Sequence, residues 1–210
     1  MDENKLNIIK PFGPAIAKVK MPEKIINALN DHVDKIVNNE GLSKKFDNGK
    51  NLAGNVKQEL SLSKEISEES GWSSFLINST RAWIKFCLGK NIKEFQINTS
   101  WVVRQFSNEY NPVHWHSGHI SGAGFLKLPS TFGETFQKDK KNLNGKLSLI
   151  HGQRAFMSDS QYKITPEVGD FYIFPHYLMH TVYPFKDTDE ERRSISFNAA
   201  IDEKIFDVFV

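Results

Sequence analysis

The hydrophobic pattern of the second half of the chain constrains the fold more than any other feature. From residue 95 onward, apolar side chains recur at every second position in a series of short stretches. These stretches are 95–106, 124–128, 145–150, 170–174 and 193–201. A period of two is typical of β-strands, and short strands separated by turn residues build barrels and sandwiches. The sequence therefore predicts a mainly β fold, a sheet sandwich or jelly roll, over residues 95–210.

Helices are predicted in the first half of the chain. In residues 22–39 the apolar positions recur at helical spacing, and Pro22 suits a first helical turn. A second helix is predicted over residues 73–89, where Gly89 is a suitable C-terminal stop. Residues 8–21 indicate a strand interrupted by Gly and Pro, and the polar segment 38–72 indicates a loop with a short strand or helix. We expect residues 1–94 to support the β core within a single domain, 1–210.

Composition excludes several classes of protein. The chain has 27 basic and 25 acidic residues and a net charge of +2, which gives no case for a nucleic-acid or membrane surface. No apolar run approaches the length of a membrane span. Cys87 is the only cysteine, and the first 20 residues lack the apolar segment of a signal peptide. These features favour a cytoplasmic protein, and oligomeric state stays open.

Histidines gather in the sequence HWHSGHISG, residues 114–122. Of the 7 histidines in the chain, this segment holds His114, His116 and His119. On a strand, His114 and His116 would project from the same face, because side chains alternate between faces. A third candidate ligand is His180, between a strand-like stretch and a Pro-bounded turn. Imidazole suits Fe, Zn, Cu and Ni, and three protein ligands with open positions are typical of catalytic metal sites.

Other interpretations of the histidines stay open at this point. A strand with His-x-His also fits a polar, hydrogen-bonded face without a metal. His119 competes with His116 if a loop begins at Ser117. His151 is a candidate for the cavity wall or a turn cap, whereas His176 would share a face with His180 only on a helix, against which the preceding proline argues.

Arg193 is the further candidate that strand parity identifies. It shares the parity of Ile195, Phe197 and Ala199, so it is expected to point toward the apolar side of its strand. A buried guanidinium needs a partner, and a carboxylate of a small ligand would satisfy it. The alternative is an arginine at a strand start that reaches solvent.

The ordered set HWH, SGAGFLKLP, TPEVGDFYIFPHYLMHTVYPF and RRSISFN resembles the 2-oxoglutarate- and Fe(II)-dependent oxygenases. It is most similar to the prolyl-hydroxylase-like oxygenases of bacteria and phages that carry an HxH motif followed by a distal histidine. The resemblance covers about residues 95–200. It implies a double-stranded β-helix, the cupin-like jelly roll, with N-terminal supporting helices and a metal site near one mouth.

The resemblance also implies cofactors and roles for individual residues. His114, His116 and His180 match the iron ligands, and Arg193 matches the basic residue that binds the distal carboxylate of 2-oxoglutarate. Asn198, Ser196 and Arg104 are expected to line the pocket, with apolar walls from Trp101, Phe125, Tyr172 and Phe174. The implied reaction uses Fe(II), 2-oxoglutarate and O2, and it couples oxidative decarboxylation to C–H hydroxylation of a small-molecule or peptide substrate. Prolyl residues are the family analogy for that substrate.

The sequence departs from the superfamily pattern at His116, where most members have Asp or Glu. An imidazole in place of a carboxylate raises the net charge of the iron and co-substrate unit by one. The site is then an active three-histidine centre, a site that recruits Asp170 or Glu109, or an inactive one. Corresponding alternatives for the protein are a jelly-roll binding or phage structural module and a three-histidine oxygenase that does not use 2-oxoglutarate. Residues 38–72 and 138–145 are candidates for a lid or for solvated surface.

Overall fold

The computed structural model describes residues 7–9 and 13–207, which form two antiparallel sheets that face each other. The larger, seven-stranded sheet has the order β1-β2-β9-β6-β11-β4-β3. Its strands are β1 (Asn7–Ile9), β2 (Ile16–Lys20), β3 (Gln58–Ser61), β4 (Phe95–Gln105), β6 (Ile120–Lys127), β9 (Asp170–Pro175) and β11 (Arg192–Ile201). The smaller, four-stranded sheet has the order β5-β10-β7-β8, with β5 (Asn111–His114), β7 (Leu147–Ile150), β8 (Gln161–Ile164) and β10 (Met179–Val182). This is the predicted jelly roll.

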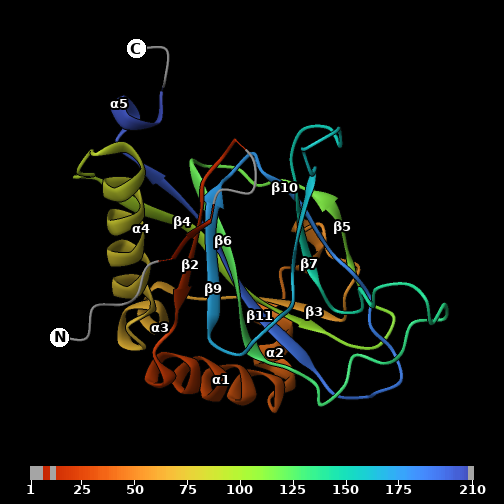
Figure 1. Cartoon of the computed structure of the whole chain (residues 1–210). Helices are drawn as coiled ribbons and strands as arrows, with labels where there is room; N and C mark the ends of the chain where they lie inside the picture. The colour runs from red at the N-terminus through yellow and green to blue at the C-terminus, as the bar shows by residue number, and fades with distance from the viewer. Residues whose placement is uncertain (1–6, 10–12, 208–210) are drawn as a thin grey trace.

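Helices cover the outer face of the larger sheet, opposite the smaller sheet (Figure 1). The two long ones are α1 (Glu23–Val37) and α4 (Trp72–Leu88), and they confirm the two predicted helices. Pro22 precedes α1, and Gly89 ends α4 in the left-handed conformation that glycine adopts readily. The shorter helices are α2 (Glu40–Phe46), the 3-10 helix η1 (Gly49–Asn51), α3 (Lys64–Glu69) and α5 (Glu203–Phe206). None of the helices in the described part of the chain is long and apolar enough to cross a membrane.

The larger sheet is buried on both faces, and this fact decides where the site lies. One face packs against α1 and α4 in a core that includes Trp72, Phe171 and Phe197. The other face packs against the smaller sheet in a second core that includes Phe125 and Phe174. Along β11, odd-numbered residues from Arg193 to Ala199 therefore face the helices, whereas even-numbered residues from Arg192 to Asn198 face the space between the sheets.

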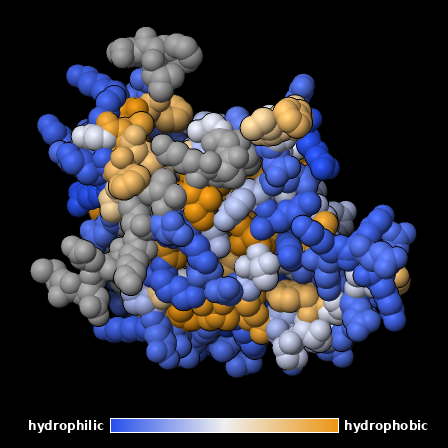
Figure 2. Space-filling view, viewed as in Figure 1, coloured by the Kyte–Doolittle hydropathy of each residue, from blue (hydrophilic) through white to orange (hydrophobic). Residues whose placement is uncertain are grey.

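The polar segment 38–72 is more ordered than the sequence predicts. It contains α2, η1, β3 and α3, and β3 pairs with β4 as an edge strand of the larger sheet. The predicted strand over residues 8–21 is observed as β1 and β2, and residues 10–12 lie outside the described residues. In the loop 138–145, residues 138–142 are exposed and belong to a hydrophilic projection at the right of Figure 2. Its position favours solvated surface over a lid.

Candidate metal centre

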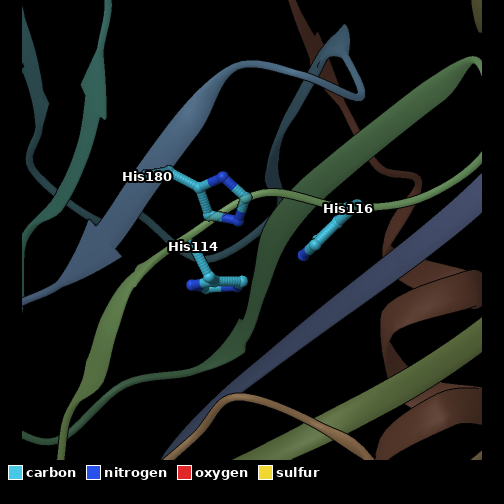
Figure 3. A group of neighbouring side chains, drawn as sticks. All are labelled: His114, His116 and His180. Atoms are coloured by element: carbon cyan, nitrogen blue, oxygen red, sulfur yellow. The ribbon is translucent and has the colours of Figure 1, made fainter.

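Three histidine rings converge in the space between the two sheets (Figure 3). His114 ends β5, and His180 lies directly opposite it on the paired strand β10. His116 follows β5 and completes the group. The ring centroids are 4.3 Å apart for His114 and His180, 4.7 Å for His116 and His180, and 5.2 Å for His114 and His116. One ring nitrogen from each histidine lies within 4.8 Å of the other two, so the cluster could hold a single metal ion.

His116 joins this cluster for a reason other than strand alternation. The strand β5 ends at His114, so the predicted HxH strand does not extend to His116. Instead, the backbone N–H of His116 donates to the carbonyl of His176 at 3.1 Å, and its ring nitrogen Nδ1 contacts the hydroxyl of Ser121. The turn after β5 therefore directs the ring toward the same point.

Hydrogen bonds leave a nitrogen of each ring available for a metal. His114 Nδ1 is 2.8 Å from the carbonyl oxygen of Pro112, and His180 Nδ1 is 2.9 Å from that of Leu178. A carbonyl can only accept, so these Nδ1 atoms carry the protons and each Nε2 keeps its lone pair. His116 Nδ1 can donate to Ser121 Oγ in the same way. Hydrogen bonds from the far nitrogen are the usual means of orienting a histidine ligand.

Burial keeps these imidazoles neutral. Desolvation lowers the pKa of His180 to about 4, and the neighbouring His114 adds to the effect. Desolvation, together with His180 and His114, lowers the pKa of His116 to about 2. The pKa of His114 is lowered by burial as well. Because only a neutral imidazole can bind a metal, the cluster is in its metal-binding form at pH 7.

A cavity of about 280 Å³ opens beside the three histidines. The predicted wall residues Trp101 and Phe125 line it, and Phe174 packs against His180 with ring centroids 5.2 Å apart. Tyr172 lies deeper in the core between the sheets and does not line the cavity. The even-numbered residues of β11 form one side: Arg192, Ser194, Ser196 and Asn198.

Arg192 is the cationic residue that this strand presents to the cavity. Its side chain is 1% exposed, and Nη1 donates to Gln105 Oε1 at 3.0 Å and to Ser194 Oγ at 3.3 Å. Its Nε is buried without a hydrogen-bond partner, and no described carboxylate lies within ion-pair distance. Burial lowers the pKa of Arg192 to about 10, so it is charged at pH 7. The cavity therefore contains a buried positive charge that the described residues do not neutralise.

Arg193 does not lie where the sequence predicts. Its parity with Ile195 is confirmed, but that side of β11 faces α1 rather than the cavity. There the guanidinium binds Asp34 at 2.7 Å and Glu191 at 2.9 and 3.0 Å, and it also donates to Asn30. With two carboxylates already bound, Arg193 has no place for a ligand.

Arg104 is on the same helix-facing side and also lies outside the cavity. Its guanidinium donates to Glu191 Oε1 at 2.9 Å and to Gln58 Oε1 at 2.9 Å. Two of the pocket residues that the sequence suggests do line the cavity, namely Asn198 and Ser196. Asn198 Oδ1 accepts from Ser121 Oγ at 3.1 Å, which connects it to the hydroxyl that contacts His116.

The remaining candidates from the sequence lie elsewhere. His119 stacks on Phe206, with ring centroids 3.9 Å apart, and accepts a hydrogen bond from the N–H of Ile201. His151 does not line the cavity. Asp170 pairs with Lys18 and Lys20, and the Glu109 carboxylate accepts from the N–H of Phe106, so neither replaces the missing carboxylate ligand.

Sequence reasoning missed Arg192 and Glu59. A usable signal for Arg192 was the run of polar residues at alternate positions of an otherwise apolar strand, Arg192, Ser194, Ser196 and Asn198. For Glu59 no such signal exists, because β3 comes from a polar segment whose place beside the cavity depends on long-range packing.

A family model described as "Putative 2OG-Fe(II) oxygenase" matches residues 99–198 of the chain. The matched segment contains all three clustered histidines and Arg192. Among curated proteins, none matches the sequence.

Solved structures of low sequence identity share the fold. A Pseudomonas putida prolyl-4-hydroxylase has 13% identity and a TM-score of 0.56, over 87% of this chain and 91% of that chain. The viral collagen prolyl hydroxylase from Paramecium Bursaria Chlorella virus-1, in its 2OG complex, has 14% identity and a TM-score of 0.52, over 88% and 94%. AviO1 from Streptomyces viridochromogenes has 12% identity and a TM-score of 0.55, over 90% of each chain. These likenesses show the double-stranded β-helix.

Proposed function

We propose that this protein hydroxylates a C–H bond of its substrate at the three-histidine cluster, in keeping with the match of residues 99–198 to the model of the 2OG-Fe(II) oxygenases. The family uses Fe(II), 2-oxoglutarate and O2. In our proposal His114, His116 and His180 hold the iron, and Arg192 binds the distal carboxylate of 2-oxoglutarate.

The donor set fits Fe(II). Imidazole is a good ligand for iron, and three protein ligands leave positions open for 2-oxoglutarate and O2. The proton of each Nδ1 is held by a carbonyl or a hydroxyl, which points Nε2 of His114, His116 and His180 into the cluster. The three neutral rings need no deprotonation before they bind the metal.

The single observation that carries the proposal is the uncompensated charge of Arg192 in the cavity that the histidines share. An isolated buried guanidinium costs several kcal/mol unless a partner is supplied. A planar carboxylate matches the fork of guanidinium N–H groups, and Arg192 Nε is free to donate. The carboxylate of 2-oxoglutarate meets this need, whereas an oxygenase that uses only O2 would leave the charge unpaired.

Bound iron would supply the oxidising chemistry, in which 2-oxoglutarate loses CO2 to give succinate and one oxygen atom enters the substrate C–H bond. The residues of this chain position and protect that reaction. Gln105 and Ser194 fix the orientation of Arg192, and hence of the co-substrate. Trp101 and Phe125 supply apolar walls that limit the access of water to the oxidant.

We propose a substrate class by analogy with solved structures of the same fold. Two of the solved structures with this fold are named as prolyl hydroxylases. A prolyl C–H bond is therefore a candidate target, and either a free small molecule or a peptide could present it. The fold alone does not imply this specificity.

Anaerobic titration of the full-length apoprotein with Fe(II), with and without 2-oxoglutarate, tests the proposal. We expect a visible metal-to-ligand charge-transfer band that requires both components. His180→Ala should remove the band and the formation of succinate in air, because it removes a ligand from the paired strand β10. His119→Ala is the matched control, since His119 lies outside the cluster.

Each of the other outcomes would support a different function for this protein. Iron binding without the band would favour the three-histidine oxygenase that does not use 2-oxoglutarate. Failure of both iron and 2-oxoglutarate to bind would favour the jelly-roll binding module. Retained succinate formation in His180→Ala would disprove the assignment of this histidine as a ligand.

A further inference from the structure

Glu59 on β3 is a buried carboxylate beside the proposed catalytic cavity. Among the described residues that line the cavity, it is the only Asp or Glu. Glu59 lies opposite Val103 of β4, whose side chain also lines the cavity. The side chain of Glu59 is 1% exposed. A carboxylate so thoroughly removed from water normally has an ion-pair or hydrogen-bond partner.

Glu59 has no such partner among the described residues. Its Oε2 is buried and accepts no hydrogen bond, and no described Lys, Arg or His forms an ion pair with it. Arg192 lines the same cavity but lies beyond ion-pair distance. Burial, and to a lesser extent Asp47, raises the pKa of Glu59 to about 7, which is the behaviour of a carboxyl group without a compensating cation.

The surrounding chain encloses this carboxyl group. Asn51, Leu52 and Ala53 line the cavity next to β3, and Gly54 packs so closely that a Cβ there would lie 2.7 Å from Glu59 Oε1. The loop is fixed by paired backbone hydrogen bonds between Asn55 and Tyr110. Bulk solvent is therefore kept from the carboxyl group, and the cavity is the direction from which a partner can approach.

The bound co-substrate cannot be the hydrogen-bond donor that Glu59 lacks. 2-Oxoglutarate is an anion, and its carboxylate would neutralise Arg192 rather than Glu59. A second anionic group cannot pair with a carboxylate, whereas an ammonium or a guanidinium donates charge-assisted hydrogen bonds to one. The iron would be held by the three histidines, a cluster that does not include Glu59, so the occupant left to supply a donor is the substrate.

We infer that the substrate carries a cationic group, an alkylammonium or a guanidinium, which binds Glu59 and so fixes the substrate beside the iron. This inference rests on the proposed function for the location of the reaction, and it goes further by naming the chemical class of the substrate. It favours a free amine, or a peptide with a basic side chain near the target, over a prolyl residue in an uncharged peptide. Glu59 would be a specificity residue rather than a metal ligand, since it is not part of the histidine cluster.

Binding of a small cation to the full-length protein tests this inference directly. The probe is n-butylammonium chloride, and 1-butanol is its neutral analogue. Fluorescence of Trp101 and Trp115, both of which line the cavity, reports binding, and sodium chloride at equal ionic strength corrects for salt. The titration is made on the apoprotein and, without oxygen, on the protein with Fe(II) and 2-oxoglutarate.

We expect n-butylammonium to bind saturably and about tenfold or more tightly than 1-butanol. Glu59→Gln should reduce this preference to about threefold or less, because the isosteric amide removes the charge. Glu69→Gln makes the same change on the exposed end of α3 and should keep the parental preference. Thermal unfolding of both variants checks that they are folded.

Equal binding of the two probes, no saturable binding of the cation, or an undiminished preference in folded Glu59→Gln would overturn the inference. These outcomes are separate from a failure of the proposed function. If the charge-transfer band forms but the cation is not preferred, only the inference fails. If the cation is preferred and the band never forms, the oxygenase proposal fails and the cation site stands.

Discussion

At the scale of single residues, two adjacent arginines on β11 lie on opposite faces of the larger sheet and differ in their binding partners. Arg192 faces the cavity without a carboxylate partner in the part of the chain that the structure describes, and Arg193 is bound by Asp34 and Glu191. We predict that Arg192→Met raises the dissociation constant for 2-oxoglutarate by about tenfold or more, because a charge-assisted carboxylate pair is lost. Anaerobic titration of the charge-transfer band measures this constant.

Arg193→Met is the matched variant, with the same substitution on the neighbouring residue. It should lower the free energy of unfolding by about 1.5–3 kcal/mol, because Glu191 and Asp34 lose charge-assisted hydrogen bonds while buried Glu191 keeps Arg104 as a partner. Affinity for 2-oxoglutarate should change little in the protein that remains folded. Loss of 2-oxoglutarate binding in Arg193→Met with unchanged urea unfolding would instead return the carboxylate-binding role to Arg193.

A second prediction at this scale concerns Glu59 and the pH dependence of the stability of the folded protein. Its pKa is raised to about 7 in the folded protein, from an ordinary value of 4.5. The folded state therefore holds this proton more tightly than the unfolded state. The stabilisation is complete below pH 4.5 and is lost as the pH rises through about 7.

Glu59→Gln should remove that pH dependence. We expect its Tm at pH 8 to exceed that of the parent by roughly 2–4 °C, with a smaller difference at pH 5. Thermal unfolding of the apoprotein at both pH values measures the change, and Glu69→Gln should follow the parent. An equal difference at pH 5 and pH 8 would show that Glu59 is not the group that titrates.

At the scale of elements, the glycines of β6 leave room for aromatic rings and backbone of the neighbouring strands β9 and β11. Gly122 faces the helix side, where an added Cβ would lie 2.7 Å from a ring carbon of Phe197 and 2.7 Å from the carbonyl oxygen of Tyr172. We predict that Gly122→Ala lowers the free energy of unfolding by about 1–3 kcal/mol, because the core cannot expand without strain. Urea unfolding measures the loss.

Gly41→Ala is a suitable control for this prediction. Gly41 lies on α2, is exposed, and has only an ordinary contact with Asn39 at the position of the new methyl group. Alanine favours the helix, so this variant should be neutral or slightly stabilised. A neutral Gly122→Ala would mean that the spacing of β6 and β9 is set by other contacts.

The same elements show what the sequence could and could not predict. Long periodic stretches predicted α1, α4, β4 and β11, since their side chains alternate or repeat with a clear period over many residues. The short strands β5, β8 and β10 carry too few residues for a period, and pairing alone makes them strands. Strand parity placed Arg193 correctly on the apolar side, but the larger sheet is buried on both faces, and parity cannot tell which face holds a site.

At the scale of the whole molecule, the site joins segments that local sequence cannot bring together. His114 and His180 lie on the smaller sheet, Arg192 lies on the larger sheet, and Glu59 comes from a segment before β4. The motif HxH with a distal histidine could be predicted, because the histidines are rare and clustered. The cavity itself depends on the packing of two sheets and a covering loop. The periodicity of the sequence does not predict this packing.

This arrangement predicts how ligands stabilise the protein. A metal ion on the smaller sheet and a 2-oxoglutarate carboxylate on Arg192 would bridge the two sheets, so both must be present for the full effect. With Mn(II) as a redox-silent substitute already bound, 2-oxoglutarate at about 100 times its dissociation constant should add about 2.7 kcal/mol and raise Tm by roughly 5–10 °C.

Thermal unfolding with Mn(II), with 2-oxoglutarate, and with both together measures this coupling. We expect 2-oxoglutarate alone to change Tm little, because the chain supplies only Arg192 and its hydrogen-bonding neighbours for it. His180→Ala should abolish the joint increment, since it removes the ligand that β10 contributes, and His119→Ala should retain it. Increments that simply add, or a full shift with 2-oxoglutarate alone, would show that the metal and the co-substrate do not meet between the sheets.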